Sequence, residues 1–220
     1  MIKPDEIIRS RRKTLSISID AFARLIVRAP LKCSEERIFA FLQEKERWIL
    51  RKKAEMAGAG IQLPPENPDG YAFMLLGKEC QIMLTSENRI RFDKEQNRLY
   101  LPSENWKKRL IAWLKTNAKR ILTELTKTQA QEMGTSFVSV TITSAKSRWG
   151  ACTYDNKIRY SFRLIYVPKE VIAYVVTHEL AHTRYKNHSP LFWREVEKYE
   201  PRYKEKRRWL KTHGALMYVF

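Results

Sequence analysis

The sequence predicts an α+β fold in which a β-rich N-terminal part with one helix, residues 1–101, precedes a part with long helices and a small sheet, residues 102–220. Two observations support this prediction. Short segments that alternate between apolar and polar residues crowd the first hundred positions, as in half-buried strands. Farther along, apolar residues recur at helical spacing over long stretches. No internal repeat or low-complexity segment appears in the chain.

The N-terminal part begins with a predicted hairpin. Residues 11–19 and 23–29 alternate between apolar and polar side chains around a turn at Asp20-Ala21-Phe22. Ser34 can act as the N-cap of a helix that runs to about Ala57. This helix is expected to end at two glycines, Gly58 and Gly60.

A loop and four strands are expected to complete this part. Proline, asparagine and glycine crowd residues 64–70, which indicates a loop. The strands are expected at 71–76, 79–85, 89–93 and 98–101.

A long amphipathic helix is expected to open the second part. Ser103 is its predicted N-cap and Gly134 its predicted end. Residues 138–142 and 157–162 alternate and predict strands, and the latter is expected to lie as an edge strand beside the metal helix described next. The inward face of the long helix is expected to carry Trp106, Leu110, Trp113, Leu114, Ile121 and Leu125.

The most informative stretch, residues 178–188, reads His-Glu-Leu-Ala-His-Thr-Arg-Tyr-Lys-Asn-His and holds three of the four histidines in the chain. On a helix, His178 and His182 share one face and can hold one metal ion. Glu179 lies beside them, where a carboxylate can reach a metal-bound water. His188 follows beyond the expected helix end and can return as a third ligand. Three protein ligands leave one position open, as in a catalytic zinc site.

The flanking residues favour metal binding over a surface helix that carries two histidines by chance. The helix after Pro168 is apolar nearly all round, which predicts that it is buried. Buried histidines need partners, and a shared metal supplies them. Metzincin-type zinc proteases have the same histidine spacing but place a glycine where this chain has Tyr185. Ser189-Pro190 then predicts the start of a further helix that stops at Glu200-Pro201.

Several motifs together resemble a known family. The segment 146–152 reads Lys-Ser-Arg-Trp-Gly-Ala-Cys, and it precedes His-Glu-Leu-Ala-His and then Asn-His-Ser with Phe192-Trp193. This order and spacing resemble the YgjP-like metallopeptidase family, which is related to the SprT-like zinc proteins. The resemblance extends weakly to the N-terminus and covers essentially the whole chain. Family members usually have a serine where this chain has Ala151, a difference that gives no reason to expect altered metal binding.

The resemblance implies a zincin-like metal-site domain, with His178, His182 and His188 as zinc ligands and Glu179 as the catalytic residue. Zinc, one ion per chain, suits imidazole ligands and an open site, although nickel or manganese could substitute. The substrate-binding candidates in the 146–152 loop are Lys146 and Arg148. Arg148 could polarise a carbonyl or hold a phosphate, and a structural salt bridge is an equally good interpretation.

Composition narrows the class of protein further. The chain of 220 residues has 42 Lys and Arg against 24 Asp and Glu, a net charge of +18, which favours anionic partners such as nucleic acid or nucleotides. The basic residues cluster at Arg9–Lys13, at Lys107–Arg120 and, most densely, at Arg202–Lys211, although solvated basic surfaces are common. Three widely spaced cysteines predict reduced thiols and a cytoplasmic protein. No apolar run approaches the length of a membrane span, so no membrane partner is expected.

Three functions fit these features. The first is a zinc-dependent hydrolase, by resemblance a metallopeptidase, in which Glu179 is the general base for a metal-activated water and the substrate is a peptide. The second keeps the metal and Glu179 but hydrolyses nucleotide phosphoanhydrides, as a nucleotide pyrophosphatase does. The third is a nucleic-acid-binding protein with a structural zinc, which an intact Glu179 speaks against. The sequence leaves the oligomeric state open.

Overall fold

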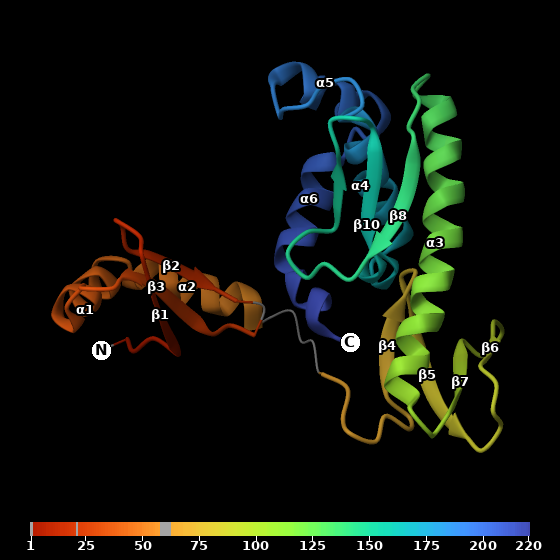
Figure 1. The fold of residues 1–220 in the computed structure, drawn as a ribbon, viewed down its shortest axis with the longest axis horizontal. Coiled ribbons are helices and arrows are strands. Elements are labelled where there is room, and N and C mark those ends of the chain that lie inside the picture. Colours follow the sequence, from red (N-terminus) through yellow and green to blue (C-terminus); the bar gives the residue numbers. More distant parts are fainter. Residues whose placement is uncertain (1, 21, 58–62) are drawn as a thin grey trace. The chain divides into compact units, whose positions relative to one another are not determined.

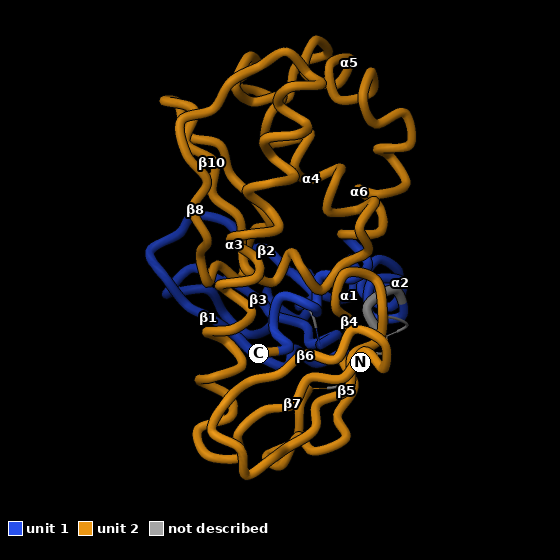
Figure 2. Tube along the Cα trace, turned by 90° about the vertical axis from the view of Figure 1, so that its right-hand side faces the viewer, with its two compact units in different colours: residues 1–62, 211–219 blue, residues 63–210, 220 orange. Residues whose placement is uncertain are grey.

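The computed structural model describes residues 2–20, 22–57 and 63–220 (Figure 1). The predicted turn residue Ala21 and the predicted helix-ending glycines Gly58 and Gly60 lie outside these residues. The chain forms two compact units, coloured separately in Figure 2. The smaller unit comprises Met1–Gln62 and Lys211–Val219, and the larger comprises Leu63–Leu210 and Phe220.

The smaller unit contains a three-stranded sheet and two helices. Strands β2 (Ser16–Ile19) and β3 (Leu25–Pro30) form the predicted antiparallel hairpin. The sequence did not predict β1 (Glu6–Ser10), which pairs parallel to β3 on its other side. The 3-10 helix η2 (Gly214–Tyr218) also belongs to this unit.

The single helix predicted between Ser34 and Ala57 is wrong, because two helices occupy this range. Ser34 caps α1 (Glu35–Glu44) as expected by accepting a hydrogen bond from the Arg37 N–H. The chain leaves helical geometry at Lys45, with φ −97° and ψ 9°, before α2 (Glu46–Ala57) begins. The break allows apolar residues from both helices to enter one core with the sheet. That core contains Leu25, Val27, Ala29, Ile38, Leu42 and Ile49.

The larger unit begins with the predicted four short strands. They are β4 (Ala72–Leu75), β5 (Lys78–Thr85), β6 (Arg91–Asp93) and β7 (Arg98–Pro102). The strand order is β4-β5-β7-β6, in which β5 and β7 are parallel and the other pairs antiparallel.

The long helix α3 (Trp106–Glu132) follows β7, and its predicted cap is wrong. Ser103 instead continues the pairing of the sheet, since its N–H and hydroxyl both bond to the Thr85 carbonyl. Asn105 is the N-cap, in left-handed geometry and without a side-chain bond to the helix. Gly134, with φ 59°, follows the C-terminus as predicted. The buried residues of α3 recur at every fourth position: Leu110, Leu114, Ala118, Leu122, Thr126 and Ala130.

That stripe differs in part from the predicted inward face. Leu110 and Leu114 were predicted correctly, whereas Trp106, Trp113, Ile121 and Leu125 are half-buried. The helix lies beside a second small sheet (Figure 1) and also contacts η1 (Phe162–Tyr166).

The second sheet consists of β8 (Ser139–Thr143), β9 (Gly150–Cys152) and β10 (Lys157–Ser161), in the order β8-β10-β9. Strand β10 was expected at the edge of the sheet beside the metal helix, and this prediction is wrong. It lies in the centre, parallel to β8 and antiparallel to β9, and β9 is the edge strand that contacts α4.

Three helices end the larger unit: α4 (Lys169–Ala181), α5 (Pro190–Tyr199) and α6 (Tyr203–Thr212), the last of which continues into the smaller unit. Helix α4 is buried along most of its length, as its apolar sequence predicted. Ser189 caps α5 by accepting from the Phe192 N–H, and Pro190 is the first helical residue, both as predicted. Among the described residues, no helix has the length and apolar composition that crossing a bilayer requires.

The compact units divide the chain at a different place from the predicted boundary after residue 101. The four strands β4 to β7 group with the larger unit because β7 contacts α3 and β4 contacts η1. The two-part architecture nevertheless matches the predicted fold class: an α+β protein with a β-rich N-terminal part.

Candidate metal centre

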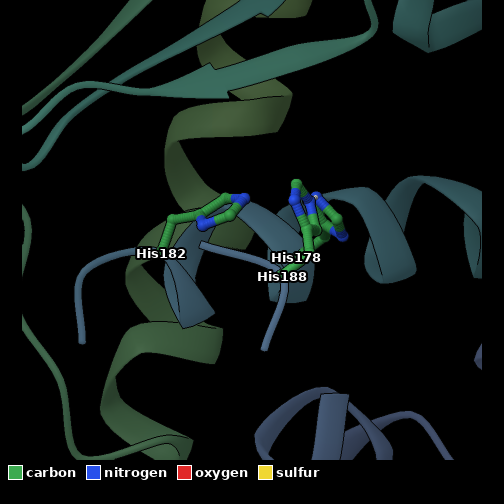
Figure 3. Close-up of side chains that lie close together, drawn as sticks. All are labelled: His178, His182 and His188. Atoms are coloured by element: carbon green, nitrogen blue, oxygen red, sulfur yellow. Dashed lines mark hydrogen bonds between the residues drawn. The ribbon is translucent and has the colours of Figure 1, made fainter. Parts of the chain in front are cut away.

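The structure brings the three histidines of the 178–188 motif together. Each histidine offers one ring nitrogen, and these three nitrogens lie within 4.8 Å of one another (Figure 3). His178 and His182 lie one helical turn apart at the C-terminal end of α4, and His182 is its C-cap residue. His188 returns from the loop before α5, and its Nε2 lies 3.1 Å from Nε2 of His178. Among the described residues, this is the one cluster with metal-ligating character.

The loop between the helices fixes the tautomer of His182. Its Nδ1 lies 2.8 Å from the Tyr185 carbonyl oxygen, and a carbonyl can only accept, so Nδ1 carries the proton. The lone pair on Nε2 is therefore free to bind a metal, and the ring is oriented by a partner of the kind that metal-binding histidines use. Tyr185 thus contributes its backbone at the position where metzincins have a glycine.

Apolar and aromatic residues surround the cluster. Phe192 is fully buried and stacks on the His182 ring with centroids 4.4 Å apart, and it also contacts the other two imidazoles. Trp193 packs against His178 and His188 at centroid distances of 5.8 and 5.6 Å. These rings restrict the rotamers of the histidines and exclude water from one side of the cluster.

The electrostatics of the cluster suit a cation. Burial, followed by the neighbouring imidazoles His182 and His188 and the Arg207 guanidinium, lowers the pKa of His178 to about 3. Burial also lowers the pKa of His182. Neutral imidazoles with free lone pairs are the form that binds metals. The Nε2 atoms of His178 and His188 lie 3.1 Å apart, a distance at which they can share one proton, whereas one metal ion can bind both nitrogens. The three residues therefore fit a metal such as zinc.

Glu179 is buried beside the cluster, with 5% of its surface exposed. Burial raises its pKa to about 8, while the Arg148 charge and a hydrogen bond from the Cys152 N–H act in the opposite direction. Strand β9 encloses the carboxylate closely: a Cβ atom at Gly150 would lie 2.6 Å from Oε1 of Glu179. The edge strand of the sheet thus fixes the position of this carboxylate.

Of the two residues predicted to bind substrate, only Arg148 has a charge that acts on Glu179. Arg148 is exposed on the loop before β9, and its positive charge acts on Glu179. Lys146 is exposed two residues earlier, and its role stays a prediction. Sequence reasoning missed Arg207 of α6, whose guanidinium lies over the Trp193 ring at 4.9 Å and whose charge acts on His178. No spacing rule links this residue to the motif.

Arg184 holds the loop that carries His188. Its guanidinium donates to the carbonyls of Met133 and Gly134 after α3 and also pairs with Glu195 of α5. Thr183 bonds to Thr135 and to the Leu180 carbonyl. These contacts explain how residues 183–188 return to α4 without regular secondary structure of their own.

Comparison with known proteins identifies the class of protein to which the chain belongs. The YgjP-like metallopeptidase domain matches residues 13–213, which places the chain in a class of metal-dependent hydrolases. The chain belongs to the YgjP-like metallopeptidase family. No curated protein matches the chain. Among solved structures, it is similar to the metallopeptidase zymogen of Pyrococcus abyssi abylysin, with 28% identity over 41% of this chain and 92% of that chain and a TM-score of 0.38.

Proposed function

We propose that this protein is a zinc-dependent peptidase in which His178, His182 and His188 hold the metal and Glu179 is the general base. The observation that carries the proposal is a cluster of three imidazoles with nitrogens within 4.8 Å of one another, together with a buried carboxylate at Glu179, the residue that follows His178. A structural zinc usually has four protein ligands, whereas the described residues supply three in this cluster. Family membership supports peptide hydrolysis as the reaction.

In this proposal zinc supplies a Lewis acid that lowers the pKa of a coordinated water to about 7. Glu179 accepts the proton of the attacking water and returns it to the leaving amine. Its buried setting, which raises its pKa to about 8, strengthens the carboxylate as a proton acceptor. The Arg148 charge and a cation held by the imidazoles both favour the ionised form that the base requires.

Arg148 has a second role in the proposal. It is exposed and yet close enough for its charge to act on Glu179, so its guanidinium can meet a substrate at the mouth of the site. There it can donate a hydrogen bond to the carbonyl of the scissile peptide and stabilise the charge that develops on the oxygen.

One observation favours a second candidate, the hydrolysis of nucleotide phosphoanhydrides. Two guanidinium charges act on the candidate site, Arg148 on Glu179 and Arg207 on His178. Phosphates are bound well by arginine. The same base and metal would then act on a phosphorus centre.

An activity panel separates the candidates. Purified protein loaded with zinc is assayed against denatured casein, unstructured peptides and nucleoside triphosphates, each with and without a chelator. The peptidase proposal expects cleavage of casein or peptides that the chelator and Glu179→Gln both abolish. Chelator-sensitive release of pyrophosphate without peptide cleavage would replace it by the second candidate. An inactive protein that binds one zinc would favour a structural metal.

A further inference from the structure

A cavity of about 510 Å³ in the larger unit shares none of its lining residues with the metal centre. It lies among the β4–β5 turn, strand β6 with the turn that follows it, the middle of α3 and the start of α4. This volume falls in the range of small-ligand sites in proteins.

The cavity is strongly basic. Lys78, Lys94, Arg120 and Lys169 line it, and no Asp or Glu does so among the described residues. All four side chains are exposed, so a ligand can contact them from solvent. Four cations with no acid among them attract a ligand with several negative charges.

Aromatic rings form part of the wall between these cations. Phe92 of β6 and Trp113 of α3 contact each other with centroids 5.7 Å apart and planes at 56°. Both are half-buried, so each ring retains an accessible part. Aromatic side chains interleaved with cations are the combination that binds unpaired bases and their phosphates.

The backbone holds the walls in place without a ligand. Gly77 has φ 81° in the β4–β5 turn, and a Cβ there would lie 3.2 Å from the Cα of Pro168. The preceding Leu76, with φ 53°, donates its N–H to the Ile165 carbonyl. The turn that carries Lys78 is therefore packed against the start of the helix that carries Lys169.

Helix α3 carries further basic residues. At its N-terminal end, a second concavity of about 520 Å³ is lined by Trp106, Lys107 and Lys108, together with Asn105 and Ile111. Lys108 and Arg120 are 12 residues apart, which is about 18 Å along a helix and about a third of a turn around it, so a ligand that contacts both must follow the curved surface of α3. A ligand with phosphates at regular intervals can contact both places, whereas a single nucleotide cannot.

We propose that this cavity and the concavity at the N-terminal end of α3 bind single-stranded nucleic acid, with one base against Phe92 and Trp113 and the neighbouring phosphates at the four cations. Bases of a duplex are already stacked and paired, so they cannot use the rings. The metal centre takes no part in this binding.

The test compares two triple variants with equal loss of charge. The first, Lys94→Gln with Arg120→Gln and Lys169→Gln, removes three of the cavity cations. The control, Lys3→Gln with Lys157→Gln and Lys198→Gln, removes three exposed lysines elsewhere. The probe is a fluorescein-labelled 12-nucleotide DNA strand of mixed sequence, measured by anisotropy from 50 to 300 mM salt. Zinc content and circular dichroism verify the fold of each variant.

The cavity variant is expected to bind the strand at least about tenfold more weakly, with a log–log salt slope smaller by about 2, while the control changes much less. Phe92→Leu, which keeps the charge, is expected to weaken binding at least about fivefold through lost stacking. Equal losses in both triple variants would overturn the proposal, as would equally tight binding of a 12-base-pair duplex. Displacement of the strand by micromolar adenosine monophosphate would show a site for free nucleotides and would also overturn it.

Discussion

The Glu179 carboxylate occupies space that is open only because residue 150 is a glycine. Gly150 has a negative φ, so its backbone geometry does not require glycine, and its role is one of space. A Cβ there would lie 2.6, 2.8 and 2.9 Å from three atoms of the Glu179 side chain. The glycine of the Lys-Ser-Arg-Trp-Gly motif thus has a physical explanation: it lets an edge strand cover the carboxylate, and the Cys152 N–H of that strand donates to it.

Gly150→Ala is therefore expected to displace Glu179 and lower hydrolytic activity on the order of 10²-fold, since small displacements of a reacting group have effects of this size. Zinc content should stay near one per chain because the atoms that a Cβ at Gly150 would meet first belong to Glu179 and not to the imidazoles. The measurement is kcat/KM on the best substrate of the panel, alongside zinc content. Gly214→Ala is the matched control, since its Cβ would meet nothing within 4 Å. Unchanged activity in Gly150→Ala would contradict this account of the motif.

Glu179→Gln tests the base directly. Glutamine keeps the shape of the side chain but accepts no proton at neutral pH, so activity is expected to fall about 10²–10⁴-fold. Zinc binding should persist because the three imidazoles are unchanged. Turnover is measured at saturating substrate, and zinc by elemental analysis. Turnover near that of the unmodified protein would exclude Glu179 as the base.

At the scale of elements, the site joins a helix, a loop and an edge strand that are distant in sequence. Local spacing predicted the His178–His182 pair and the Ser189 cap correctly, because both depend on residues within one or two turns. It could not predict that Phe192 would stack on His182, or that Gly150 would lie against Glu179. Those contacts depend on how separate elements pack.

The wrong predictions about elements have the same origin. Ser103 is a residue type that often caps helices, but its N–H and hydroxyl both donate to the Thr85 carbonyl of the sheet instead. The break at Lys45 follows from the burial of Ile38, Leu42 and Ile49 in one core. No glycine or proline at this position indicates a break in the sequence. The central position of β10 could not be predicted because its neighbour β9 has only three residues, too few to show a strand pattern in the sequence.

His182→Ala tests the cluster that these elements form. It is expected to remove most of the bound zinc, because two ligands remain and the ring that stacks on Phe192 is lost. Its thermal midpoint should no longer rise when zinc is added, since a ligand stabilises only the state that binds it. His213→Ala is the control, because the fourth histidine lies outside the cluster and contacts the Thr212 hydroxyl. Full zinc retention in His182→Ala would reject the ligand assignment.

At the scale of the molecule, the net charge of +18 is distributed in a way that counting residues could not reveal. The densest sequence cluster, Arg202–Lys211, is partly engaged within the protein. Arg202 pairs with Glu205, and Arg207 lies over Trp193 beside the candidate site. The cavity cations Lys78, Lys94 and Lys169 are far apart in sequence, so only the fold brings them to one place.

The larger unit also contains Phe220, which contacts residues far from it in sequence. Phe220 is 5% exposed and groups with the larger unit, whereas the nine residues before it group with the smaller. Its ring makes edge contacts with four aromatic residues at centroid distances of 5.5 to 6.5 Å: Tyr71, Phe73, Trp106 and Tyr166. Its carbonyl oxygen accepts from Arg163, which is itself buried.

Phe220→Ala is therefore expected to lower the free energy of unfolding of the larger unit by about 3–5 kcal/mol, the usual cost of deleting a buried aromatic ring. The backbone bond to Arg163 can persist, so the loss reports the ring. Urea unfolding followed by circular dichroism gives the free energy from the midpoint and slope. Tyr154→Ala is the control, since that ring is 89% exposed and its loss should change stability by about 0.5 kcal/mol or less. A similar small change in both variants would show that the ring of Phe220 adds little to the larger unit.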